Sequence, residues 1–129
     1  MTRTEFMRAL GGGLAVAALG GRGAAAHHGW AWAEAEQVEL KGRVQEVYVG
    51  YPHPTLRVAT ASDGIWQVDL ANPSQTARAG FGEGTAKPGD EVTALGNRSR
   101  DPAEKRLKAV RLSLGGRTYD LYPERIRGG

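Results

Sequence analysis

The sequence predicts a mainly β protein, a small antiparallel barrel of five to six strands with one short helix, preceded by a cleaved signal peptide. Residues 1–26 have the layout of an export signal. Apolar residues alternate along several later segments, as they do in half-buried strands. Residues 72–80 carry the start and stop residues of a helix.

The first 26 residues are expected to be removed during export. Arg3 and Arg8 precede an apolar run at 10–20 that is too short to cross a bilayer as a helix, and alanines at 24–26 can form a cleavage site. A buried N-terminal helix is the alternative, but it would have to hold five glycines between positions 11 and 21. We therefore expect a soluble periplasmic protein with an N-terminal segment at 27–36, a β domain at 37–122 and a tail at 123–129.

Charge and cysteine content narrow the function classes. The chain has 17 Lys and Arg, 14 Asp and Glu and no Cys. Loss of residues 1–26 leaves 14 basic and 13 acidic residues, so nucleic acid is not an expected partner. Without cysteine the domain must rely on its apolar core. The basic run at 98–111 also contains acidic residues and predicts a solvated hairpin.

The first three strands follow from apolar alternation. In the segment 37–51 the apolar parity changes near Gln45 and Glu46, which predicts a β-bulge that bends a long strand. Two strands follow at 56–60 and 66–70. The Ser-Asp-Gly sequence at 62–64 predicts the hairpin turn between them, because Asp-Gly accepts positive φ.

The second half predicts one helix and more strands. Asn72 can cap a helix, Pro73 fits its first position and Gly80 can end it. A turn at 87–90 leads into a strand at 92–95, and a fifth strand at 107–114 turns at 115–116 into a short strand at 118–121. This order is that of the oligonucleotide/oligosaccharide-binding barrel, the OB-fold. An open antiparallel meander or a small sandwich fits the same pattern.

The histidines are the candidate metal ligands. Cleavage after Ala26 would give His27 a free amine, so that its amine and imidazole chelate one ion together with His28. Cleavage after Ala25 would place His28 third, where amine, amides and imidazole offer four nitrogens. Both arrangements favour copper(II). His53 lies between two prolines that restrict its direction, and it is the candidate third ligand; a loop imidazole bonded to backbone is the alternative.

Aromatic and basic residues form a second candidate site. Trp30 and Trp32 share one face of an extended segment, as a hydrophobic anchor or a ligand platform would. Tyr48, Tyr51 and Arg100 are candidates for stacking and pairing on a barrel face. Trp66 is expected in the core. No nucleophile motif, phosphate loop or dinucleotide fingerprint occurs, and Asp63 and Asp69 are explained by solvation, so we do not expect an enzyme.

The segments AHHGW, GRVQEVYVGYPHPTLRV, KPGDEVTALG and SRDPAEKRLKAVRL together resemble a family of small exported proteobacterial proteins of uncharacterised function, from His27 to about Leu121. Tyr51 departs from the family pattern, standing where asparagine is usual. The resemblance implies that the paired histidines and the Pro-His element share one site. The matching positions are His27, His28, Gly29, Trp30, Gly42, Val44, Pro52, His53, Gly89, Asp90, Gly96, Arg100, Asp101 and Pro102.

Two functions are compatible with these observations. One is a non-enzymatic periplasmic protein that captures copper or another divalent metal through His27 and His28, with help from His53. The alternative is a metal-independent OB-like module that binds an extended polymer or a periplasmic partner protein through Tyr48, Tyr51 and the arginines near 98–111.

Overall fold

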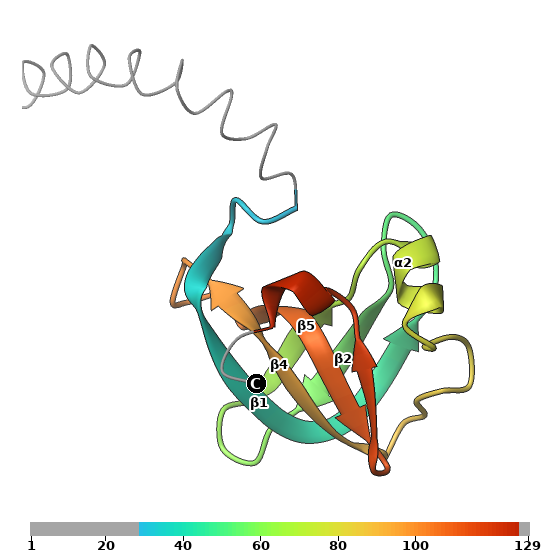
Figure 1. The fold of residues 1–129 in the computed structure, drawn as a ribbon. Coiled ribbons are helices and arrows are strands. Elements are labelled where there is room, and N and C mark those ends of the chain that lie inside the picture. Colours follow the sequence, from blue (N-terminus) through green and yellow to red (C-terminus); the bar gives the residue numbers. More distant parts are fainter. Residues whose placement is uncertain (1–28, 127–129) are drawn as a thin grey trace, which may run out of the picture. The chain divides into compact units, whose positions relative to one another are not determined.

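The computed structural model describes residues 29–126 (Figure 1). The expected signal peptide, His27, His28 and the last three residues lie outside the described part. Neither helix within residues 29–126 has the length and apolar character of a membrane-spanning segment.

Six strands form one sheet, which closes into a barrel. The strands are β1 (Ala33–Tyr48), β2 (Thr55–Ala59), β3 (Ile65–Asp69), β4 (Glu91–Ser99), β5 (Arg106–Leu114) and β6 (Arg117–Asp120). Their order is β3-β2-β1-β4-β5-β6, and a further pairing of β3 with β5 closes the ring. That closing pair is parallel, whereas the other pairs are antiparallel. The predicted OB-like barrel is confirmed.

Strand β1 is bent, so that its two parts belong to different sides of the barrel (Figure 1). Its first part pairs with β4 up to Arg43, and its last part pairs with β2 from Arg43 onward. The register against β2 shifts between Val44 and Glu46, which confirms the predicted bulge. Gly42 permits the bend, because a Cβ at this position would stand 2.3 Å from the carbonyl oxygen of Ala59.

Strand β1 begins at Ala33, four residues before the boundary that the sequence suggested at Gln37. Residues 34–36 form an irregular stretch against β4. The side-chain amide of Asn97 holds this stretch by donating to the carbonyls of Glu34 and Ala35, at 2.8 and 3.1 Å. Strand β4 also runs on to Ser99, past the expected end at Leu95, because it pairs with this added part of β1.

The barrel interior is the apolar core, and one helix lies between β3 and β4. Trp66 is buried in that core, as expected. Helix α2 (Pro73–Arg78) is capped by Asn72, whose side-chain oxygen accepts a hydrogen bond from the backbone amide of Gln75. Gly80 follows the helix with a φ of 98°. The predicted helix is therefore confirmed. The largest fully buried apolar side chains are those of Val44, Leu56, Val58, Val68, Leu70, Phe81, Leu107, Val110, Leu112 and Leu121.

A 3-10 helix, η1 (Pro123–Arg125), follows β6. The sequence assigned these residues to a tail. Tyr122 and Ile126 flank η1 and are half-buried, and the side chain of Gln37 in β1 donates to the carbonyl of Arg125 at 2.5 Å. This end of the chain thus packs against the barrel.

Candidate functional site

A row of polar residues crosses the outside of the barrel. Gln37 on β1 lies opposite Asn97 on β4, Asn97 lies opposite Lys108 on β5, and Lys108 lies opposite Asp69 on β3. We call these four residues the polar row. Asp69 and Lys108 are buried, with 0% and 5% of their surface exposed. Because a buried charge is costly without hydrogen-bond or ionic partners, the groups that cover the row must compensate the charges of Asp69 and Lys108.

Asp69 is the centre of the row. One carboxylate oxygen accepts two hydrogen bonds from Arg106, from Nε at 3.0 Å and from Nη2 at 2.7 Å. The other oxygen accepts from the side-chain amide of Gln67 at 2.8 Å. The sequence suggested a solvated carboxylate here, and this is wrong: the parallel pairing of β3 with β5 places Arg106 and Lys108 beside Asp69.

His53 faces Asp69 from the loop between β1 and β2. Its Nε2 lies 3.8 Å from Oδ2 of Asp69, and its Nδ1 lies 3.3 Å from the carbonyl oxygen of Pro54. A quarter of the side chain is exposed. The proline-flanked loop therefore holds the imidazole at a fixed place on the barrel, where one edge of the ring is reachable from solvent.

Trp32 lies over Arg106, the residue that donates two hydrogen bonds to Asp69. The guanidinium carbon of Arg106 is 3.8 Å from the centre of the Trp32 ring, which is close enough for a cation–π contact. The backbone carbonyl of Trp32 accepts from the amide of Arg100 at 2.9 Å. Trp32 is thus fixed on the barrel by a cation on the outer face of β5.

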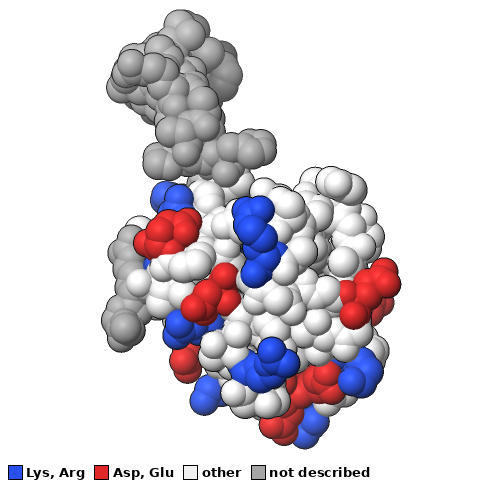
Figure 2. Space-filling model, turned by 45° about the vertical axis from the view of Figure 1, so that its right-hand side comes forward, with Lys and Arg blue, Asp and Glu red and all other residues white. Residues whose placement is uncertain are grey.

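The basic run is less solvated than the sequence suggested. Arg100 and Lys105 are exposed as expected, but Arg98 lies 5.1 Å from the Trp66 ring and Lys108 lies 5.5 Å from the Tyr122 ring. Burial lowers the pKa of the Lys108 ammonium, and Asp69 opposes that shift. On the face shown in Figure 2, acidic and basic side chains are interspersed, with no broad surface of one sign.

Tyr48 and Tyr51 lie in and beside the loop that carries His53. They are 50% and 80% exposed, and the hydroxyl of Tyr48 donates to the carbonyl of Tyr51 at 2.5 Å. Among the large apolar side chains of the described part, these two rings and Ile65 are the exposed ones. Both tyrosines are therefore available for contact with a partner.

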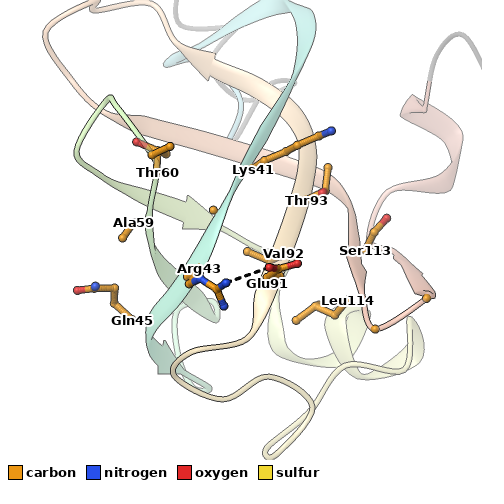
Figure 3. A pocket seen from close by; sticks show the side chains of 14 residues that line it. Lys41, Arg43, Gln45, Ala59, Thr60, Glu91, Val92, Thr93, Ser113 and Leu114 are labelled. Atoms are coloured by element: carbon orange, nitrogen blue, oxygen red, sulfur yellow. Dashed lines mark hydrogen bonds and ion pairs between the residues drawn. The ribbon is translucent and has the colours of Figure 1, made fainter.

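A groove of about 730 Å³ lies along the bend in β1 (Figure 3). The side chains of Lys41 and Arg43 come from β1, and Thr93 and Glu91 come from β4. Arg43 is paired with Glu91 at 3.0 Å. None of the ligand or metal residues that the sequence predicted lines this groove.

The structure brings only some of the predicted site residues together. His53 lies beside Asp69, and Trp32 lies over Arg106. Arg100 reaches this pair only through its backbone bond to Trp32. Tyr48 ends β1, and Tyr51 lies in the loop that carries His53. Trp30 precedes Trp32 in a half-buried turn position. His27 and His28 lie outside the described residues, and residues 29–126 contain no cluster of three or more His, Cys, Asp or Glu that could hold a metal. The opposing positions of Asp69 and Lys108 depend on a pairing between distant strands, so sequence reasoning missed them.

A family model matches residues 15–108. The chain belongs to a family of unknown function (DUF6152). The match includes His53, Asp69 and Arg106, so the surroundings of Asp69 lie inside the family region. No protein with a curated description matches the chain in sequence.

Solved structures resemble the barrel at 18% identity. A mutant of TiaS lacking its ZRD, in complex with agmatine, aligns with a TM-score of 0.52 over 71% of this chain and 28% of its own, and it shares the fold. The Stn1-Ten1 complex of S. pombe gives 0.48 over 60% and 57%, and a complex of TiaS with an isoleucine tRNA and ATP gives 0.44 over 61% and 18%. The chain spans 57%, 18% and 28% of the length of the Stn1-Ten1, tRNA-bound TiaS and agmatine-bound TiaS chains.

Proposed function

We propose that this protein is an exported, non-enzymatic binding protein that captures copper(II) with its N-terminal histidines and His53. The main support is that Trp32 and His53 both lie against the ion pair of Arg106 and Asp69. Arg106 lies against Trp32 and bonds Asp69, and Asp69 faces His53. The point at which the chain joins the barrel is therefore held near His53.

Chain length then limits where the terminal histidines can go. Trp32 stands five positions after His27, and an extended chain spans roughly 3.5 Å per residue, or about 17 Å in all. His53 falls within that reach, because Trp32 contacts Arg106, Arg106 bonds Asp69, and Asp69 lies 3.8 Å from His53. This supports one shared site better than sequence spacing alone.

The local charge favours a particular kind of metal complex. Arg106 and Lys108 both lie beside Asp69, so a bare divalent cation would be repelled there. Copper(II) accepts tetragonal nitrogen sites, and binding to backbone amides releases their protons, which reduces the charge of the complex. A chelate at a free N-terminus therefore fits better than a site built from carboxylates.

Copper titration of two chains tests this proposal. One chain begins at His27, and the other carries one added Ser-Gly pair before His27, which moves the free amine away from the imidazole. We expect tight binding by the first chain and weaker binding by the second, measured by isothermal titration calorimetry. Equal affinities would reject the N-terminal chelate.

A metal-independent binding module is the second candidate, favoured by the exposure of Tyr48 and Tyr51. Exposed aromatic rings beside a positioned loop are typical contact points for a partner protein or an extended polymer. This function predicts that Tyr51→Ala or Arg100→Ala weakens capture of a partner from periplasmic extract. Capture that is lost with His27→Ala and kept with Tyr51→Ala would contradict it.

A further inference from the structure

The groove of Figure 3 contains three hydrogen-bond donors that follow one another across the sheet. Lys41 on β1 lies opposite Thr93 on β4, and Thr93 lies opposite Ser113 on β5. All three line the groove, and Figure 3 shows them in this order. Neighbouring strands lie about 5 Å apart, so the ammonium and the two hydroxyls can reach one small group. We call these three residues the donor row.

The charged residues beside the donor row are already paired. Arg43, two positions after Lys41, bonds Glu91 at 3.0 Å, and Arg111, two positions before Ser113, bonds Asp120 at 2.6 Å. By contrast, the side chains of the donor row take part in no hydrogen bond or ion pair within residues 29–126. Their polar groups are therefore available to a ligand.

The charges in the groove select an anion as that ligand. Lys41 and Arg43 are basic, and Glu91 is the single acid among the described residues that line the groove, which leaves one net positive charge. Glu91 is held by Arg43, so Lys41 has no counter-ion there. Glu39 lies on the same face of β1 but does not line the groove. Because a lysine ammonium can only donate hydrogen bonds, its ligand must supply acceptor oxygens.

A phosphate group fits the donor row better than a carboxylate does. Its terminal oxygens point in different directions, so the ammonium and the two hydroxyls can each bond a separate oxygen. A carboxylate offers two oxygens in one plane. Lysine, serine and threonine side chains are regular partners of phosphate oxygens. The groove volume of about 730 Å³ also leaves room for the organic part of a phosphate ester.

We propose that the donor row is a phosphate-binding site, which takes inorganic phosphate or the phosphate group of a small ester. Lys41 supplies the charge, and the hydroxyls of Thr93 and Ser113 donate to phosphate oxygens. Arg43 adds a second positive charge at the side of the site. This site contains none of the histidines of the proposed copper site, so loss of one site leaves the other intact.

Nuclear magnetic resonance titration of the ¹⁵N-labelled full chain tests the proposal, with inorganic phosphate, glycerol 3-phosphate and acetate as separate probes at constant ionic strength. We expect saturable shifts of the backbone amide signals of Thr93 and Ser113 with phosphate or its ester, and weaker binding of acetate. Tighter binding of glycerol 3-phosphate would assign the site to a phosphorylated molecule. Equal affinities would assign it to the phosphate ion.

Charge variants should change the affinity in opposite directions. Lys41→Gln should weaken phosphate binding roughly tenfold, because it removes a hydrogen bond between charged groups. Glu91→Gln should strengthen binding roughly threefold, because it removes the acid and releases Arg43. Arg78→Gln is the matched control, since Arg78 is exposed on α2, lies outside the groove and loses the same charge.

A hydroxyl variant completes the test. Thr93→Val combined with Ser113→Ala removes both hydroxyls with little change of shape and should weaken binding roughly tenfold. Equal urea midpoints for all variants will show that folding is unchanged. Three results would overturn the proposal: no saturable shifts with either phosphate compound, acetate binding as tight as phosphate binding, or equal losses in Arg78→Gln and Lys41→Gln.

Discussion

Gly42 shows how one residue fixes the curvature of the barrel. A Cβ there would stand 2.3 Å from the Ala59 carbonyl oxygen and 2.7 Å from a methyl group of Val58, so β1 and β2 would have to separate. We expect Gly42→Ala to lower the free energy of unfolding by about 1–3 kcal/mol, as overpacking does. Gly82→Ala is the control, since open space surrounds that position. Equal urea midpoints for the two variants would contradict this view of the bend.

Asp69 is the residue on which the candidate site depends most. Replacing it with asparagine removes the charge that Arg106 and Lys108 share, while keeping the shape. We expect Asp69→Asn to cost about 3 kcal/mol, as the breaking of buried ion pairs does. Glu91→Gln, which breaks the exposed pair with Arg43, should leave the urea midpoint nearly unchanged. A small effect of Asp69→Asn would mean that the buried carboxylate is dispensable.

Single residues also mark the limit of prediction from sequence. Trp66, the cap at Asn72 and the glycine after the helix could be predicted, because each has a local signal. Asp69 and Lys108 could not, since each occupies the alternate position on its strand that usually faces water. They are buried because Arg106, His53 and Tyr122 arrive from other parts of the chain.

The hairpin of β5 and β6 carries an ion pair that makes stability depend on pH. Arg111 bonds Asp120 at 2.6 and 3.2 Å, and these hydrogen bonds lower the pKa of Asp120 from its usual value of 3.8. Because the folded pKa lies below the unfolded one, this pair stabilises the fold above pH 3.8, and the gain is lost as pH falls through the folded pKa.

We therefore expect the difference in stability between the wild type and Asp120→Asn to be constant at about pH 5 to 7 and to shrink below pH 3.8. The difference should not exceed about 1 kcal/mol, because both side chains are about one-third exposed. Urea denaturation at a series of pH values measures it. A difference that grows as pH falls would contradict the assigned pKa shift.

At the scale of elements, local sequence patterns predicted the barrel strands and the helix. The early start of β1 and the pairing of β3 with β5 depend instead on contacts between distant segments. The bulge at Gln45 and the Asp-Gly hairpin were readable because their signals lie within a few residues. The early start of β1 was not, because residues 33–36 alternate only small alanines with glutamates and are held by Asn97, more than 60 positions away. The parallel pairing of β3 with β5 likewise joins segments with α2 and β4 between them.

At the scale of the whole molecule, the described part covers its polar row with segments from both ends of the chain. Tyr122 and Arg125 meet Lys108 and Gln37, while Trp32 meets Arg106. The row is therefore buried only when both segments are in place. This arrangement links Trp32, just before β1, to His53 through Arg106 and Asp69, and the proposal of a shared copper site depends on that link.

Pulsed electron paramagnetic resonance of the copper(II) complex tests that central claim most directly, using a chain that begins at His27. The account predicts imidazole nitrogen couplings from the N-terminal segment and from His53, with one coupling lost in His53→Ala. It also predicts an affinity about tenfold lower for this variant, equivalent to about 1.4 kcal/mol. Unchanged spectra and unchanged affinity in His53→Ala would contradict a shared site.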